Sequence, residues 1–143
     1  MSGLVFVDTN VFLYAADQAD ARKQVRAKFW RDWLWETRRG RLSFQVLQEF
    51  YSNVCRKWPK GKAAARLEIE DLLSWKPVAA DGELLQFAWR LQDRFGFSFW
   101  DSLIIAAAKA SQCAFLLSED YQAGQNIDGL VIVNPFLTQP EQI

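Results

Sequence analysis

Four acidic residues lie in four separate stretches of the chain, and each borders a strongly apolar segment. They are Asp8, Glu49, Asp101 and Asp120. A charged carboxylate beside a hydrophobic core is costly unless something compensates its charge. The sequence contains no histidine, which excludes histidine as a base, a proton carrier or a metal ligand. A hard divalent cation such as Mg²⁺ or Mn²⁺ is the simplest common partner for several carboxylates.

Each acid also has an ordinary structural explanation. Asp8 can cap a helix, and Ser98 followed by Asp101 resembles a capping box. Asp120 suits the start of a turn or helix, and Glu49 can simply be a solvent-exposed side chain. Taken one at a time, these roles are commoner than metal binding. Four such coincidences at one edge of a sheet are much less common, so placement decides between the two interpretations.

The elements that must position these acids alternate along the chain. Strands are predicted at 4–7, 42–44, 77–80, 114–117 and 130–133. Helices are predicted at 11–16, 22–39, 45–58, 62–75, 81–95 and 98–113. Apolar strands separated by helices indicate an α/β fold in three layers, with a mainly parallel central sheet flanked by helices. No repeat, linker or low-complexity tract interrupts the pattern, which predicts a single domain over 1–143.

The spacing of apolar residues in the second predicted helix, 22–39, predicts which side of it faces the core. Val25, Phe29 and Trp33 recur at helical spacing, with Trp30 as a further candidate, and Gly40 is expected to end the helix.

The predicted topology places two acids together. In a parallel α/β sheet, ligands bind beyond the carboxyl ends of the strands. Asp8 ends the first strand and Asp120 follows the strand at 114–117, so both are expected at one edge. Asp101 lies in the first turn of a helix and Glu49 in the N-terminal half of another. Both reach the same edge if their helices begin there.

Composition and charge narrow the class of protein. Half of the residues are hydrophobic, and neither a secretory signal nor a membrane span is recognised, which favours a cytoplasmic protein. Net charge is zero, but residues 1–66 carry +7 and the remainder −7. A basic surface beside an acidic pocket suits a phosphodiester substrate; opposite charges that simply meet in the fold are the alternative.

Cys55 and Cys113 are expected to be inert, and most tryptophans are expected to lie in the core or at a protein interface.

Five stretches, in order, resemble the motifs of PIN domains, and the last resembles the ending of VapC toxins. They are 7–15, 46–51, 98–108, 116–125 and 127–136. The resemblance spans nearly the whole chain and implies a metal-dependent ribonuclease. It implies that the metal-binding acids are Asp8, Glu49, Asp101 and Asp120. Asn10 and Ser118 match supporting positions, and Glu119 is a rival to Asp120 that ranks below it.

The VapC resemblance implies a toxin of a type II toxin–antitoxin module. Its implied partners are an RNA substrate, a cognate antitoxin protein, a second copy of the chain, and operator DNA only through the antitoxin complex. The expected reaction is hydrolysis of RNA with one or two Mg²⁺ or Mn²⁺ ions. Crowded acids are expected to raise at least one carboxylate pKa when no metal is bound. The alternatives are a housekeeping PIN nuclease in RNA processing and a catalytically silent RNA-binding module.

Overall fold

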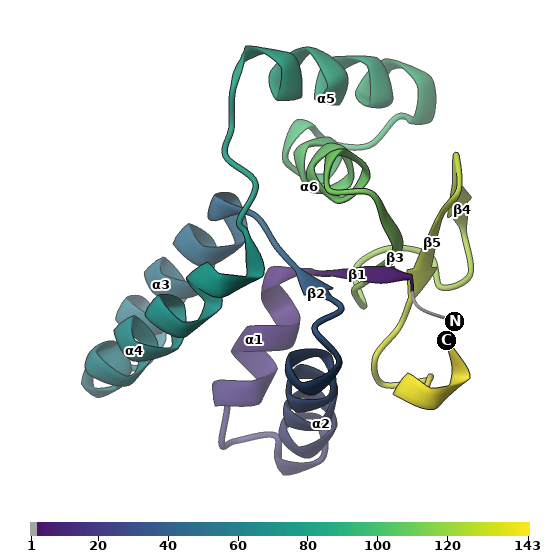
Figure 1. Cartoon of the computed structure of the whole chain (residues 1–143). Helices are drawn as coiled ribbons and strands as arrows, with labels where there is room; N and C mark the ends of the chain where they lie inside the picture. The colour runs from purple at the N-terminus through teal and green to yellow at the C-terminus, as the bar shows by residue number, and fades with distance from the viewer. Residues whose placement is uncertain (1–2) are drawn as a thin grey trace.

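The computed structural model describes residues 3–143 and contains one mostly parallel sheet (Figure 1). Its strands are β1 (Leu4–Val7), β2 (Gly40–Arg41), β3 (Cys113–Leu117), β4 (Asn126–Ile127) and β5 (Leu130–Val133). Their order across the sheet is β2-β1-β3-β5-β4. The first four strands in this order run parallel, and β4 pairs with β5 in the antiparallel direction. This arrangement confirms the predicted α/β class.

Helices make up most of the remaining chain. The α-helices are α1 (Thr9–Ala16), α2 (Ala21–Thr37), α3 (Phe44–Lys57), α4 (Lys62–Leu72), α5 (Gly82–Phe95) and α6 (Phe99–Ala110). Three short 3₁₀ turns are η1 (Pro59–Gly61), η2 (Leu73–Trp75) and η3 (Pro140–Gln142). Within residues 3–143, no helix is both long enough and apolar enough to cross a bilayer.

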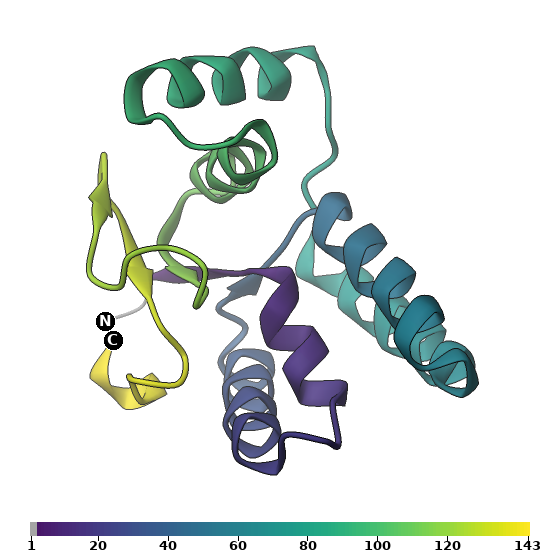
Figure 2. The same cartoon turned by 180° about the vertical axis from the view of Figure 1, so that it is seen from behind.

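The helices cover both faces of the sheet. In Figures 1 and 2, α5 and α6 lie on one face and α1 and α2 on the other. The α3–α4 hairpin stands beside the edge strand β2, and the C-terminal segment lies near the opposite side. Because both faces are covered, the interior strand β1 is apolar throughout, with Val5, Phe6 and Val7 each at most 1% exposed. The predicted three-layer arrangement is therefore confirmed.

Two predicted strands are wrong in position or extent. The strand expected at 42–44 is β2 at Gly40–Arg41, and Phe44 already belongs to α3 because Ser43 caps that helix. The strand expected at 77–80 is reduced to one parallel bridge between Val78 and Ser43. The short strand β4 was not predicted, because two residues carry no periodic signal.

Several helix boundaries also differ from expectation. α1 begins at Thr9, two residues early, because the Asp8 side chain accepts a hydrogen bond at the helix start. Gly40 does not end α2; Arg38 does so in a left-handed conformation. Gly40 is instead required by packing, since a Cβ there would lie 2.4 Å from Cζ3 of Trp75. Ends are the least predictable part of a helix because capping competes with propensity.

The apolar face predicted for α2 is wrong for Val25 and Phe29, whereas Trp30 is buried as expected and Trp33 is partly buried against the core. Val25 and Phe29 are 69% and 52% exposed, whereas Ala27, Trp30 and Leu34 are fully buried. The helix is anchored by Trp30, whose Nε1 donates to the carbonyls of Pro135 and Thr138 at 3.0 and 3.2 Å. A tryptophan that finds acceptors inside the protein fixes the rotation of its helix.

Candidate functional site

The four candidate acids occupy equivalent positions in the topology. Asp8 directly follows β1, and Asp120 follows β3 by three residues. α3 follows β2, so its early turns, with Glu49, begin at the carboxyl end of that strand. α6 leads into the amino end of β3, so its first turn, with Asp101, lies at the opposite, carboxyl edge. We call the four acids, Asp8, Glu49, Asp101 and Asp120, the acid edge.

Asp8 is the most constrained member of the acid edge. It is only 7% exposed, and its two oxygens accept hydrogen bonds at 2.8 Å from the Thr9 N–H and the Ser118 hydroxyl. Burial raises the pKa of Asp8 to about 6, partly offset by these hydrogen bonds, and the charges of Asp120 and Glu49 raise it further. A raised carboxylate pKa was expected from crowding of the acids, but burial of Asp8 is its main cause and the neighbouring acids contribute least.

Ser118 and Asn10 connect the first and last acids. Ser118 is fully buried, donates to Asp8 and accepts the backbone N–H of Asp120 at 3.1 Å. The amide of Asn10 donates to Oδ2 of Asp120. Desolvation raises the pKa of Asp120, and the charges of Glu119 and Asp101 act in the same direction. Residues far apart in the sequence thus hold two carboxylates in fixed relation.

Glu49 and Asp101 lie on helices and are held more loosely. Nε2 of Gln45, one turn earlier in α3, donates to Glu49 at 2.9 Å. Burial raises the pKa of Glu49, and the charge of Asp101 adds to the effect. At α6, Ser98 caps the backbone N–H of Asp101 at 3.1 Å, so the predicted cap exists. Asp101 itself is exposed, and its carboxylate accepts no hydrogen bond within the described chain.

Tyr121 is a neighbour of the acid edge that the sequence reasoning missed. It is 9% exposed, and its hydroxyl donates to the Asp101 carbonyl at 3.1 Å. Burial, followed by the charges of Asp8 and Asp101, raises its pKa, so the phenol stays protonated at neutral pH. Gln45 was missed as well, although its four-residue spacing from Glu49 on one helix face was a readable signal.

The acid edge has no cationic partner in the described chain. The ion pairs found within residues 3–143 involve Asp32, Glu68, Glu119 and Asp128, and no member of the acid edge. The donors that reach the acid edge are neutral side chains and backbone N–H groups. Neutral donors hold a carboxylate in place but leave its charge in the site. This distinguishes the acid edge from acids that serve in salt bridges.

The donor set fits a hard divalent cation in chemical type. The acids offer carboxylate oxygens, which such cations prefer. Two buried hydroxyl oxygens form no hydrogen bond within residues 3–143, and each belongs to the residue that follows an acid: Thr9 Oγ1 after Asp8 and Ser102 Oγ after Asp101. The acids are nevertheless spread out. No three acidic or cysteine side chains in the described chain are gathered closely enough to form a complete metal-binding cluster. Mutual repulsion among carboxylates favours such separation.

Glu119 behaves differently from its neighbour Asp120. It forms an ion pair with Nζ of Lys23 at 2.9 Å, and Lys23 also lies over the rings of Tyr14 and Phe136 at 4.5 and 4.8 Å. A cation already compensates its charge, which agrees with the lower rank given to Glu119. Lys23 also joins the acid edge to a second region.

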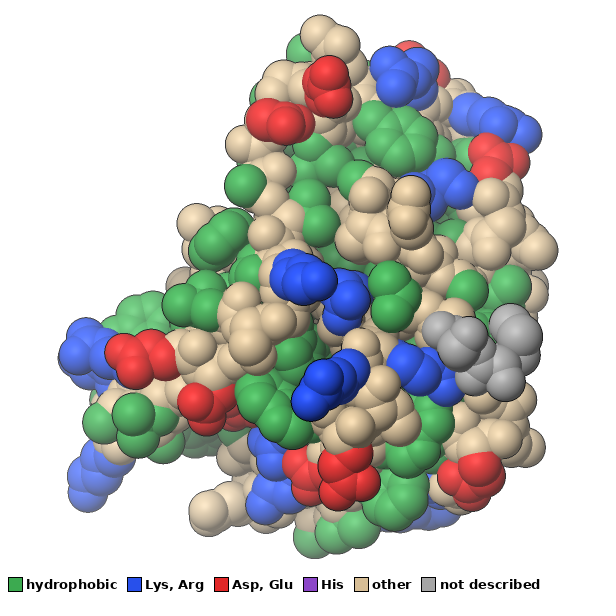
Figure 3. Space-filling model, viewed as in Figure 1, with side chains coloured by type: hydrophobic (Ala, Val, Ile, Leu, Met, Phe, Trp, Pro, Cys, Tyr) green, Lys and Arg blue, Asp and Glu red, His purple; other side chains and the backbone are tan. Residues whose placement is uncertain are grey.

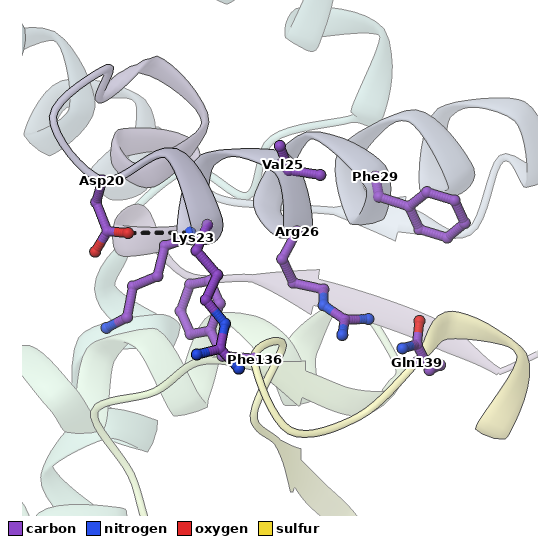
Figure 4. Close-up of a pocket in the computed structure, with 8 residues that line it drawn as sticks. Asp20, Lys23, Val25, Arg26, Phe29, Phe136 and Gln139 are labelled. Carbon is purple, nitrogen blue, oxygen red and sulfur yellow. Dashed lines mark hydrogen bonds between the residues drawn. The ribbon is translucent and has the colours of Figure 1, made fainter.

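That region is a groove of about 820 Å³ between α2 and the C-terminal segment (Figure 4). We call it the α2 groove; it is lined by Asp20, Arg22, Lys23, Val25, Arg26, Phe29, Phe136 and Gln139. Figure 4 shows Arg26 reaching toward Gln139 across the groove. Arg22 and Arg26 form no ion pair within residues 3–143. The groove therefore carries uncompensated positive charge beside exposed apolar surface.

The basic residues 1–66 and the acidic remainder of the chain are only partly separated in the folded structure. On the face seen in Figure 3, Lys and Arg side chains gather near the centre, over β2 and the adjoining end of α2, and acidic side chains lie mostly toward the margins. The α2 end lies at the amino end of β2, opposite the acid edge. Positive charge near the acid edge therefore comes from the start of α2.

Both cysteines are poor candidates for chemistry. Cys113 is buried in β3, and desolvation raises its thiol pKa to about 11. Cys55 is half-buried in α3. A thiol whose pKa lies well above neutrality is a weak nucleophile. The expectation that most tryptophans lie in the core or at an interface is met for the core part. Trp30 and Trp75 are buried, Trp33 and Trp58 are partly buried against the core, and Trp35, Trp89 and Trp100 are exposed.

The amino-acid sequence matches the model of a known family. The sequence model of the PIN domain family matches residues 5–126. The chain belongs to the PIN domain family. A comparison with curated proteins found no significant match. The matched residues include all four acids together with Asn10 and Ser118.

Solved structures of one toxin and of two toxin–antitoxin assemblies contain chains with this fold. A toxin–antitoxin complex from Klebsiella pneumoniae aligns with TM-score 0.65 and 12% identity, over 92% of this chain and 97% of that one. VapC20 from Mycobacterium tuberculosis, a toxin that cleaves the sarcin-ricin loop, aligns with TM-score 0.60 and 24% identity, over 81% and 89%. VapBC2 from Rickettsia felis, bound to a DNA fragment from its promoter, aligns with TM-score 0.60 and 16% identity, over 90% and 96%. At these identities the likeness establishes the shared fold.

Proposed function

We propose that this PIN domain is an endoribonuclease that depends on Mg²⁺ or Mn²⁺ and acts as the toxin of a VapBC-type toxin–antitoxin module. One observation carries the proposal: four acids follow elements that end or begin at the carboxyl edge of the sheet, and none of them has a cationic partner in the described chain. Acids kept for stability are normally paired or fully solvated. Acids kept uncompensated in a partly buried site suit a cation supplied from outside.

In this proposal the chain supplies the ligands and fixes their geometry. Asp8, Asp101 and Glu49 would hold the principal cation, and Asp120 would complete its shell or hold a second one. When bound, the cation would supply Lewis-acid chemistry toward water and toward the phosphate oxygens. Ser118 and the Thr9 N–H keep Asp8 in one orientation, which reduces the cost of arranging the site for the reaction.

The other side chains have supporting roles. Asn10 would orient Asp120, and Gln45 would orient Glu49, each through a neutral hydrogen bond that leaves the acid charged. Asp8 is only partly ionised near pH 6 because burial opposes its charge. It is therefore ready to lose its proton when positive charge arrives. The sequence has no histidine, so proton transfer would rest on carboxylates and water.

The α2 groove would guide the RNA backbone toward the acid edge. Arg22 and Arg26 lack acidic partners in the described chain, and Lys23 connects the groove to Glu119, next to Asp120. Phosphates attract such side chains without regard to sequence. The acid edge on its own would repel a polyanion, so a neighbouring basic groove resolves the electrostatic conflict.

The partners follow from the structural relatives. Two of them are toxin–antitoxin assemblies, one on promoter DNA. By analogy, a small antitoxin would bind this chain and restrain it, and operator DNA would be bound only through that complex. A homodimer is part of the same proposal. The unpaired acids argue against a silent RNA-binding module, because such a module has no use for uncompensated charge.

Brief induction of the chain in cells, followed by mapping of RNA 5′ ends, tests the proposal. We expect new ends at defined sites with the wild type and none with Asp8→Asn. Purified wild type should cleave the mapped RNA with Mn²⁺ and stop in EDTA. Cleavage by Asp8→Asn at the wild-type rate, or cleavage unaffected by EDTA, would refute the nuclease mechanism. Growth arrest that no small neighbouring protein relieves would favour the housekeeping nuclease.

A further inference from the structure

A small pocket of about 350 Å³ adjoins the acid edge on the side of α3 and α6. Its walls include Phe44, Gln45, Gln48, Ala79 and Trp100, and no charged residue contributes to its lining. We call it the Trp100 pocket. Its volume lies at the low end for ligand sites, which suits one flat group rather than an extended ligand. The lack of charge makes it unsuited to a phosphate.

Residues that line the Trp100 pocket also contact or adjoin members of the acid edge. Nε2 of Gln45 donates to Glu49 at 2.9 Å and approaches the carbonyl of Trp100 at 3.5 Å. Trp100 directly precedes Asp101 in the first turn of α6. The Gln45 side chain therefore connects the pocket wall to Glu49 and to Trp100, the residue before Asp101. Anything bound in the pocket would sit next to the position where a phosphate meets the acids.

The aromatic surface of the pocket is exposed. Trp100 is 64% exposed and Phe44 is 41% exposed, although both begin helices whose other apolar residues are largely buried. Phe99 packs edge-on against Trp100, with ring centroids 5.1 Å apart, and so supports the indole. A large, supported and exposed aromatic side chain is a stacking platform for a nucleobase.

We propose that the Trp100 pocket binds one unpaired nucleobase of the RNA, next to the phosphodiester that is cleaved. This inference rests on the proposed function and adds the class of substrate. The base would stack on Trp100, while the amides of Gln45 and Gln48 provide a donor and an acceptor for its edge. Gln48 is exposed and makes no hydrogen bond within residues 3–143. A base inside a duplex cannot enter, so the substrate is single-stranded or has an extruded base.

Abasic scanning of a short RNA that spans the mapped cleavage site tests this pocket. One base at a time is removed, and kcat/KM is measured for wild type, Trp100→Ala and Trp100→Phe. Trp89→Ala is the matched control, because Trp89 is also exposed, at 53%, but lies on α5 and does not line the pocket.

We expect one position near the cleaved bond where removal of the base lowers wild-type kcat/KM between about 5-fold and 150-fold. Trp100→Ala should lower kcat/KM on the intact RNA by a similar factor and lose its response to that abasic position. Trp100→Phe should keep much of the response, and Trp89→Ala should keep all of it.

Two results would overturn the inference. The first is an abasic profile that Trp100→Ala leaves unchanged, which includes the case in which the pocket receives a side chain of a protein partner. The second is equal cleavage of duplex and single-stranded RNA of the same sequence. Either result leaves the nuclease proposal standing. Failure of the wild type to cleave any RNA with Mn²⁺ would instead remove the proposed function, and this inference with it.

Discussion

The acid edge and the α2 groove are neighbouring regions that carry unpaired charges of opposite sign. At the acid edge, Asp8 is buried and held by neutral donors, with no cationic partner in the described chain. In the groove, Arg22 and Arg26 have no acidic partners, and exposed apolar side chains surround them. The ion pair between Lys23 of the groove and Glu119, the neighbour of Asp120, links the two regions. Regions of opposite, uncompensated charge side by side suit a polyanion that must approach a cation.

The largest effect should come from removing one uncompensated charge. Asp101→Asn replaces an exposed carboxylate that accepts no hydrogen bond in the described chain, so the fold should be preserved. We expect cleavage of RNA to fall about 10³-fold or more, because a cation ligand and its charge are both lost. Steady-state cleavage and thermal unfolding measure the two consequences.

Asp93→Asn is the matched control, since Asp93 is an exposed acid on α5 outside the acid edge. It should retain wild-type activity. Equal activity of Asp101→Asn and Asp93→Asn would erase the distinction between the acid edge and ordinary surface acids.

The second comparison is between the two sides of α2. Trp30 is fully buried and donates to two carbonyls of the C-terminal segment, so Trp30→Ala should cost about 3–5 kcal/mol of unfolding free energy. Phe29 is 52% exposed, and Phe29→Ser should change that free energy by less than about 0.5 kcal/mol. Urea unfolding compares them. Similar losses would mean that the groove is covered in solution.

Asp8 should make the metal-free protein less stable as the pH rises. Its folded-state pKa of about 6 lies above the ordinary value of 3.8, so the native state keeps a proton that the unfolded chain releases. Stability therefore falls between about pH 4 and pH 6 and stays lower above that range. Asp8→Asn removes this cost, and we expect it to be about 2–3 kcal/mol more stable than wild type at pH 8 in EDTA.

Below pH 4 the two proteins should be equally stable, and Mn²⁺ should narrow the gap at pH 8 by stabilising the wild type alone. Chemical unfolding across this pH range provides the measurement. A wild type that gains stability between pH 4 and pH 6 relative to Asp8→Asn would show that Asp8 is compensated inside the protein.

The smallest effect concerns the groove. Arg22→Ala combined with Arg26→Ala should raise KM for RNA several-fold and leave kcat nearly unchanged. The salt dependence of binding should weaken by about 1.4 in log–log slope, at about 0.7 per phosphate contact with single-stranded RNA. Arg90→Ala on α5 serves as the exposed control. An unchanged KM and salt slope would separate the groove from RNA binding and leave it available for a protein partner.

The sequence was most informative where strand ends coincide with acids. The runs before Asp8 and Asp120 are buried strands whose carboxyl ends must meet in a parallel sheet, so their proximity could be predicted. Asp101 could be assigned to the first turn of α6 because Ser98 is a strong N-cap, but its place at this edge was predicted only on condition that the helix begins there. Gln45 was overlooked although its four-residue spacing from Glu49 was readable, whereas the contact of the buried Tyr121 phenol with the Asp101 carbonyl depends on side-chain geometry that spacing does not determine.

The weakest predictions involved helix rotation and edge structure. Val25 and Phe29 fit an apolar stripe as well as Ala27 and Trp30 do, and only the contact of Trp30 with the C-terminal segment decides between them. Likewise, β2 is two residues long because Ser43 caps α3 immediately after it. Tertiary contacts override local preference in both cases.

The central claim is that the acid edge binds a divalent cation through several acids together. Calorimetric titration of Mn²⁺ into the purified chain tests it most directly, with Asp8→Asn, Asp101→Asn and Asp93→Asn measured in parallel. We expect saturable binding to the wild type and to Asp93→Asn, and binding at least tenfold weaker for the other two. Equal affinity in all four proteins, or RNA cleavage by a wild type that binds no Mn²⁺, would contradict this account.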